Sequence, residues 1–267
     1  MIKKIIKYFL RIVSNLFGVS FFVKKKIKNT NYDLIDKNIW IPFFYSDKYF
    51  SLYREGLKKS NQEKSDNFSK NLRHYSLIQC VRYVMSKKNL QNYNFAECGC
   101  WSGHSTYIIS KILKEYNFNN KFYIFDSFEG GLSDLAEEDK SLLKQMDEKE
   151  INEQKEYLKS NENCVKNVLK DFKFIEIYNG WIPEKFHYVE DKKFQFIHLD
   201  VDLYQPTKDS LNFFYPKLAQ GGVIVCDDYN FSTFPGAKKA WDDFFVDKKN
   251  ECNFFYETPF GGCLLIK

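Results

Sequence analysis

The chain lacks the cysteine patterns of metal-binding and disulfide-stapled proteins. Its 267 residues include seven cysteines, an odd number, which form no C-x-x-C pair and no array of such pairs. We therefore expect free thiols in a reducing, cytoplasmic setting. No internal repeat is visible, and the 44% of apolar and 18% of aromatic residues suffice for one large domain with an added segment.

Basic residues are scarce outside the N-terminus. Residues 1–28 contain eight Lys or Arg and no acid, so that residues 29–267 hold 32 basic and 35 acidic residues. The net charge of +5 for the whole chain thus becomes −3 for the body. Such a body lacks the basic stripe of a nucleic-acid-binding protein, and we expect no nucleic-acid partner.

The N-terminal segment also lacks a membrane span. Its longest uncharged run, Ile12 to Val23, has 12 residues, whereas a spanning helix needs about 20. A signal peptide is not indicated, because KKKIKN follows the apolar run in place of a small-residue cleavage site. Two interpretations stay open for residues 1–28: a helix on the inner face of an anionic membrane, or a helix that packs on the body or on a second subunit. A homo-oligomer is expected.

From residue 94 onward, apolar strands alternate with helices. The expected strands are 94–98, 121–126, 173–180, 194–200 and 221–229, and the expected helices include 71–88, 105–116, 207–218 and 236–248. This order predicts an α/β fold with a mostly parallel sheet covered by helices on both faces. Residues 253–267 form two short apolar runs around Gly-Gly, which is typical of a terminal antiparallel pair. Residues 29–70 predict irregular structure and short helices.

A long, highly charged insertion occupies about residues 130–163, between the second and third strands. Charged runs of this kind are usually solvated helices. Because the insertion follows a strand end, where ligands bind in parallel sheets, a lid is the favoured interpretation.

The first strand leads into a turn that lacks the G-x-G-x-x-G spacing of dinucleotide-binding folds. In NFAECGCWSGHST (94–106), Glu97 lies at the strand end, Gly99 and Gly103 lie in the turn, and Ser105 and Thr106 begin the helix. The spacing argues against a pyrophosphate ligand and hence against a dehydrogenase. An acid beside helix N–H groups suits a zwitterionic amino-acid end, such as that of S-adenosylmethionine. A plain tight turn is the alternative.

Three further residues are candidates for the cofactor site. Asp126 ends the second strand, where an acid accepts hydrogen bonds from ribose hydroxyls, and Ser127 follows it. Asp126 could instead cap the turn DSFEGG. Trp181 in NGWIPEKF could stack near an adenosyl group or serve packing alone.

Acids gather after the fourth and fifth strands. In FIHLDVDLYQP, Asp200 and Asp202 leave the strand on the same side, and VIVCDDY adds Asp227 and Asp228 on the neighbouring strand. Carboxyl ends of adjacent parallel strands lie side by side, so these carboxylates would repel one another without a cation. Hard oxygen ligands suit Mg²⁺ or Mn²⁺. Capping of the following helices is the alternative.

Five blocks, in this order and spacing, resemble the macrocin O-methyltransferase family. They are FAECGCWSGHST, FDSFEGG, YNGWIPEKF, HLDVDLYQPTKDSL with YPKLAQGGVIVCDDY, and PGAKKAWDDFF. The resemblance covers about residues 70–267 and implies a Rossmann-like class I methyltransferase domain with a seven-stranded sheet. Residues 1–69 match no block and are expected to be a separate basic and apolar helical segment with an extension.

The resemblance implies S-adenosylmethionine as cofactor, a divalent metal, and transfer to a sugar hydroxyl. It implies cofactor contacts from Glu97, Gly99, Gly103 and Asp126, and metal ligation by Asp200, Asp227 and Asp228. The more distant catechol-type enzymes place a lysine base three residues after the first metal ligand. This chain has Leu203 there, so that role cannot be carried over.

Asp202 and His198 are the remaining candidates for the base on the same strand face. His198 lies inside the apolar run and is interpreted as a core histidine, which leaves Asp200 and Asp202 as the expected catalytic pair.

The expected function is a cytoplasmic, metal-dependent O-methyltransferase that acts on a sugar nucleotide or a surface-glycan precursor. Two alternatives stay open. A methyltransferase for RNA or another small molecule would use the same fold, although the acidic body argues against RNA. A non-catalytic, membrane-associated partner protein would be expected to have lost the metal-binding acids, which are present.

Overall fold

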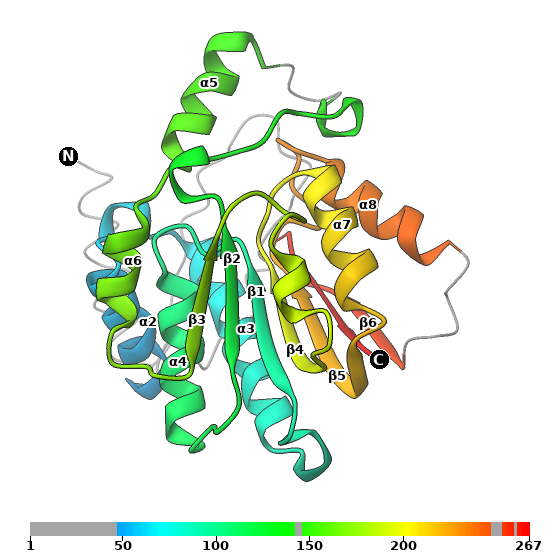
Figure 1. Cartoon of the computed structure of the whole chain (residues 1–267). Coiled ribbons are helices and arrows are strands. Elements are labelled where there is room, and N and C mark those ends of the chain that lie inside the picture. Colours follow the sequence, from blue (N-terminus) through cyan, green and yellow to red (C-terminus); the bar gives the residue numbers. More distant parts are fainter. Residues whose placement is uncertain (1–46, 142–145, 247–252, 259–260) are drawn as a thin grey trace, which may run out of the picture. The chain divides into compact units, whose positions relative to one another are not determined.

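The computed structural model describes residues 47–141, 146–246, 253–258 and 261–267, so the predicted N-terminal segment 1–28 lies outside the described residues. Helices and strands alternate along the chain (Figure 1). The helices are α2 (Asp47–Lys59), α3 (Phe68–Met85), α4 (His104–Glu115), α5 (Glu148–Tyr157), α6 (Glu162–Leu169), α7 (Tyr204–Phe214) and α8 (Gly236–Phe245). The strands are β1 (Asn94–Cys98), β2 (Phe122–Asp126), β3 (Ile175–Asn179), β4 (Phe194–Leu199), β5 (Leu218–Cys226), β6 (Phe254–Glu257) and β7 (Cys263–Ile266).

Within the described residues, the strands form one seven-stranded sheet in the order β3-β2-β1-β4-β5-β7-β6. The pairs among β1 to β5 are parallel, and β7 runs antiparallel to both β5 and β6. The predicted fold class is confirmed, including the C-terminal antiparallel pair. Because β4 and β5 are neighbours, the segments that follow them begin at the same edge of the sheet.

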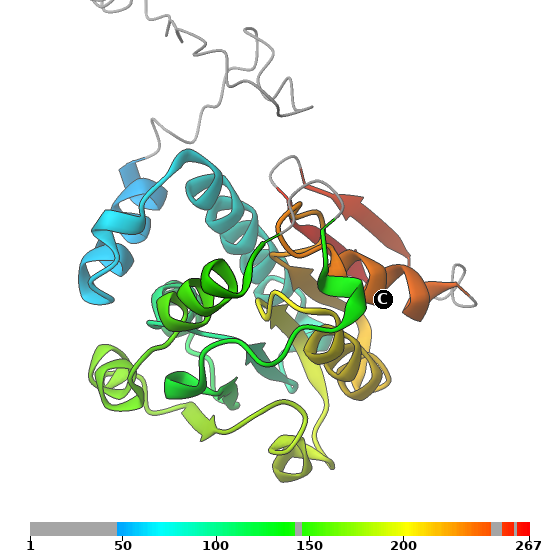
Figure 2. The same cartoon turned by 90° about the horizontal axis from the view of Figure 1, so that it is seen from above.

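Two cores lie on opposite faces of the sheet, as the alternation of side chains along a strand requires. In β2, Phe122 and Ile124 join the core beneath α2, α3 and α4, while Tyr123 and Phe125 join the core beneath α7 and α8. Figure 2 shows these two groups of helices apart from each other. Helices on both faces explain why the strands are almost continuously apolar.

The compact unit begins at Asp47, ahead of the predicted division after residue 69. Leu52, Tyr53 and Leu57 of α2 are buried in the same core as α3 and α4. The predicted helix 71–88 spans 68–85, because the Asn67 side chain accepts a hydrogen bond from the Lys70 N–H and caps the helix at that point. In the part of the chain that the structure describes, no helix combines the length and apolarity needed to cross a bilayer.

The charged insertion contains a short 3₁₀ helix, Glu137–Asp139, and α5, which stands beyond the carboxyl ends of the strands (Figure 1). Asp139 anchors it to the start of α7. This buried carboxylate accepts hydrogen bonds from the backbone N–H of Tyr204 (2.7 Å) and of Ala136 (2.8 Å). The insertion is thus attached to the body, and its movement as a lid stays a prediction.

Candidate functional site

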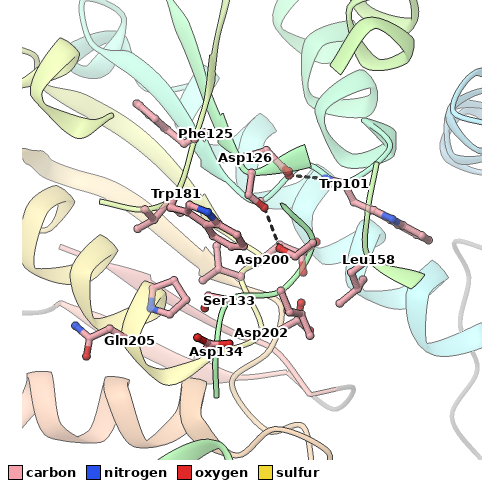
Figure 3. A pocket seen from close by; sticks show the side chains of 18 residues that line it. Trp101, Phe125, Asp126, Ser133, Asp134, Leu158, Trp181, Asp200, Asp202 and Gln205 are labelled. Carbon is pink, nitrogen blue, oxygen red and sulfur yellow. Dashed lines mark hydrogen bonds between the residues drawn. The ribbon is translucent and has the colours of Figure 1, made fainter. Parts of the chain in front are cut away.

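A cavity of about 340 Å³ opens at the carboxyl ends of β1, β2 and β4. Figure 3 shows Asp126, Trp181, Asp200 and Asp202 around this space. The insertion supplies one wall, through Gly131, Leu132, Ser133, Asp134 and Leu158. The cavity therefore lies where ligands bind in open α/β sheets.

The turn after β1 brings two strand ends into close approach. Gly99 has φ +80°, and a Cβ on it would lie 1.9 Å from the backbone oxygen of Asp200. Asp126 supports the same turn from β2: its Oδ2 accepts hydrogen bonds from the N–H groups of Cys100 (2.6 Å) and Trp101 (2.9 Å). The turn thus holds the ends of β1, β2 and β4 together beside the cavity.

We expect Gly99→Ala to lower the free energy of unfolding by about 3 kcal/mol, because the methyl group collides with backbone that cannot rotate away. Gly221→Ala is the matched control. Gly221 has a similar φ of +82°, but a Cβ there meets nothing within 4 Å, so only the backbone cost of about 1 kcal/mol applies. Chemical denaturation measures both variants. Equal losses in the two would mean that the Gly99 turn and the backbone of Asp200 are not in close contact.

Four of the predicted cofactor residues line the cavity: Gly99, Asp126, Ser127 and Trp181. Asp126 fits both interpretations made from the sequence, an acid at the ligand site and a cap of the following turn. It borders the cavity, and its Oδ1 also caps the following turn by accepting the Phe128 N–H (2.6 Å). Burial raises the pKa of Asp126, although the backbone N–H groups favour the charged form. Ser127 donates its hydroxyl hydrogen to the Gly131 carbonyl (2.9 Å).

The other four predicted cofactor residues do not line the cavity. Glu97 is fully buried, and its carboxylate contacts Thr106 and His198. Gly103 ends the turn at φ +82° on the α6 side, with Val165 nearest to it, and Ser105 and Thr106 are buried in α4. Glu97 and Thr106 are hydrogen-bonded to each other, Ser105 is buried, and Gly103 forms the end of the turn, so these residues support the turn.

The four acids after β4 and β5 come together as predicted. Asp200 and Asp202 line the cavity, and the Asp202 N–H donates to Asp228 Oδ2 (2.9 Å). Asp202 has φ +58°, so the chain turns sharply between β4 and α7. Potential ligand atoms of Asp200, Asp227 and His198 all lie within 4.8 Å of one another, a group that contains His198 in place of Asp228.

Negative charge in this cluster is only partly compensated. Burial and the neighbouring Asp227 raise the pKa of Asp200 to about 7. Burial likewise raises the pKa of Asp202 to about 6, against the influence of Arg73, and holds the pKa of Asp228 well above its usual value. Burial would raise the pKa of Asp227 too, but His198 and Arg73 outweigh it and lower that pKa. The cations present therefore neutralise Asp227 and leave the other carboxyls short of positive charge.

Both of these cations come from residues that the sequence did not assign to the site. Arg73 of α3 places Nε 3.3 Å from Asp227 Oδ2, and His198 Nε2–H donates to Asp227 Oδ1 (3.3 Å). His198 also donates from Nδ1 to Glu97 Oε1 (2.8 Å). His198 is fully buried, as predicted, yet it connects two acids rather than only filling the core. The polar pair Arg73-His74 inside an apolar helix pattern was the available signal for Arg73.

The sequence model of the macrocin-O-methyltransferase (TylF) family matches residues 59–253. The chain belongs to this family. The resemblance inferred from the five sequence blocks is confirmed, and the chain is an S-adenosylmethionine-dependent O-methyltransferase.

Relatives of this macrocin-type O-methyltransferase are distant. Demethyldecarbamoylnovobiocin O-methyltransferase of Streptomyces niveus is 24% identical over 202 residues, which cover 73% of this chain and 74% of that protein. The 8-demethyl-8-(2,3-dimethoxy-alpha-L-rhamnosyl)-tetracenomycin-C 4'-O-methyltransferase of Streptomyces olivaceus is 25% identical over 141 residues, about half of each chain (51% and 52%). The structure of the O-methyltransferase NovP superposes with a TM-score of 0.57 at 20% identity, covering 73% of this chain and 79% of that one. This likeness confirms the fold.

Proposed function

We propose that the protein transfers a methyl group from S-adenosylmethionine to a sugar hydroxyl in the cytoplasm, with a divalent cation bound by its acid cluster. The observation on which the proposal rests is one cavity bordered by both the glycine turn with Asp126 and the acids Asp200 and Asp202. A cofactor on the first group and an acceptor hydroxyl on the second would share the same space, so that positioning could supply much of the rate.

The acid cluster suits a hard cation. Asp200 and Asp227 offer carboxylate oxygens close together, and both nitrogens of His198 already donate to carboxylates, which favours oxygen ligands over that ring. The raised pKa values of Asp200 and Asp228 are those of buried acids that lack a counter-ion. We therefore propose Asp200, Asp227 and Asp228 as ligands of Mg²⁺ or Mn²⁺, which would lower the pKa of a bound hydroxyl.

Asp202 is proposed as the proton acceptor. It lines the cavity two residues after Asp200, and its backbone N–H is held by Asp228, which fixes its place in the turn. A carboxylate there can accept the proton of a hydroxyl that approaches Asp200 from the cavity. No covalent enzyme intermediate is needed, since the oxygen of the acceptor attacks the sulfonium methyl group directly.

The proposed direct contacts of the cofactor are Gly99, Asp126, Ser127 and Trp181. The residues proposed to act through the turn are Glu97, Gly103, Ser105 and Thr106.

We expect Asp126→Ala to weaken binding of S-adenosylhomocysteine sharply and to lower stability by about 2 kcal/mol, because three backbone N–H groups lose their acceptor. Calorimetry and thermal unfolding measure the two effects. Asp191→Ala, at an exposed acid paired with Lys192 outside the cavity, is the control and should cost little in either. Unchanged affinity in Asp126→Ala would remove Asp126 from the cofactor site.

The acceptor is proposed to be a sugar in a sugar nucleotide or a surface-glycan precursor, and not a nucleic acid. One relative is by its name a methyltransferase for a rhamnosyl-bearing compound, which supports a sugar. A methyl-transfer screen over nucleotide-activated sugars and neutral glycosides, with Mg²⁺ added, tests the proposal. Transfer to RNA or to a catechol, with none to any sugar, would contradict it.

A further inference from the structure

A buried ammonium group stands beside the glycine turn. Lys70 of α3 is only 9% exposed, and its Nζ lies 2.9 Å from the Ser65 hydroxyl and 5.5 Å from the centre of the Trp101 ring. Among the described residues, no carboxylate oxygen forms an ion pair with it within 4.0 Å. A buried charge without a partner is costly, so its retention calls for an anion that arrives with a ligand.

The position of Lys70 is unfavourable for helix stability as well. Lys70 is the third residue of α3, where the helix dipole disfavours positive charge. Burial lowers the pKa of Lys70 to about 8, even though Asp200, Asp66 and Asp227 act in the opposite direction. The nearby acids therefore do not replace a direct partner. The helix dipole does not account for a lysine here, and the nearby acids offset its burial only in part.

Polar neighbours connect the ammonium group to the turn and the cavity. Ser65 donates its hydroxyl hydrogen to Gln62 Oε1 (2.6 Å), and Gln62 Nε2 donates to the Ser102 hydroxyl (2.9 Å) within the turn. Trp101, whose ring lies beside Nζ, lines the cavity together with Gly99 and Asp200. An anion at the turn end of the cavity would lie beside Trp101, whose ring centre is 5.5 Å from the ammonium group.

We propose that Lys70 binds the carboxylate of the methionine part of S-adenosylmethionine. The assignment rests on the proposed placing of the cofactor, with its ribose at Asp126 and its amino-acid end at the turn that contains Gly99 and Trp101. The amino-acid carboxylate is the one anionic group of this cofactor. Lys70 then supplies the positive partner that the turn residues and Asp126, an acid, cannot provide.

The experiment compares two ligands that differ at that end. S-adenosylhomocysteine has the carboxylate, and 5'-methylthioadenosine lacks the amino-acid part. Lys70→Met should weaken S-adenosylhomocysteine binding by about 10- to 100-fold, the range of a hydrogen bond to a charged group, and leave 5'-methylthioadenosine within about twofold. Lys70→Arg should restore part of the loss. Lys166→Met, at a lysine paired with Glu162 on the surface of α6, is the matched control and should change neither affinity.

The unliganded Lys70→Met variant should unfold at the same or a higher temperature than wild type, since it removes an unpaired buried charge. A measurement on the wild type needs no variant: decarboxylated S-adenosylhomocysteine should bind weaker than S-adenosylhomocysteine by a similar factor. Equal affinity of these two ligands, or equal losses of both test ligands in Lys70→Met, would overturn the assignment. Failure of the wild type to bind S-adenosylhomocysteine at all would instead overturn the proposed function along with it.

Discussion

Chelation of divalent cations should abolish methyl transfer, and added Mg²⁺ or Mn²⁺ should restore it. Burial raises the pKa values of Asp200, Asp202 and Asp228, and of the four acids in the cluster only Asp227 has a direct contact with Arg73 and His198. A cation among them would relieve that repulsion and hold the acceptor hydroxyl. Asp200→Asn should therefore lower activity by orders of magnitude and weaken Mn²⁺ binding, measured by electron paramagnetic resonance.

Cofactor binding separates this loss from misfolding. Asp200→Asn keeps the shape of the side chain, so S-adenosylhomocysteine affinity should persist. Asp191→Asn, at an exposed acid paired with Lys192, is the control and should leave activity and Mn²⁺ affinity unchanged. If the acids only cap the following helices, Asp200→Asn should cost about 1 kcal/mol of stability with catalysis kept. Full activity in a chelated, metal-free sample would end the metal hypothesis.

Asp202→Asn should lower the rate of methyl transfer by about 10²- to 10⁴-fold, the usual contribution of a general base. An amide cannot accept the proton, but it can occupy the same turn, because the contact that holds residue 202 is its backbone N–H to Asp228. Single-turnover measurements should show the loss in the chemical step, with Mn²⁺ and S-adenosylhomocysteine affinities nearly intact.

A different result would reassign Asp202. Partial rescue of Asp202→Asn by excess metal, with weakened Mn²⁺ binding, would make it a metal ligand. An unchanged rate would mean that water, rather than Asp202, accepts the proton of the acceptor hydroxyl. The two variants together thus distinguish an acid that binds the cation from an acid that accepts the proton.

The order of strands and helices could be predicted from the sequence because local patterns determine it. Apolar runs such as FQFIHL and VIVC predict buried parallel strands, and Gly-Gly before CLLI predicts the terminal pair. The proximity of Asp200 and Asp227 could also be predicted from the sequence, because acids that follow adjacent parallel strands lie at the same edge of the sheet. α2 could not be predicted, because its apolar residues are outnumbered by charged and aromatic ones whose partners lie on α3 and α4.

By itself, the sequence determined the family, the sheet, the glycine turn and the acids at its edge, all of which depend on residues close together in the chain. Tertiary structure alone decided which side chains face the cavity and which cations face the acids. Glu97 is the penultimate residue of β1 and Asp126 the last residue of β2, yet Glu97 contacts His198 and Asp126 borders the cavity. Arg73 and Lys70 come from a helix 127 to 157 residues before Asp200 and Asp227. Pairing of buried charges across such separations depends on packing in space, which no local pattern encodes.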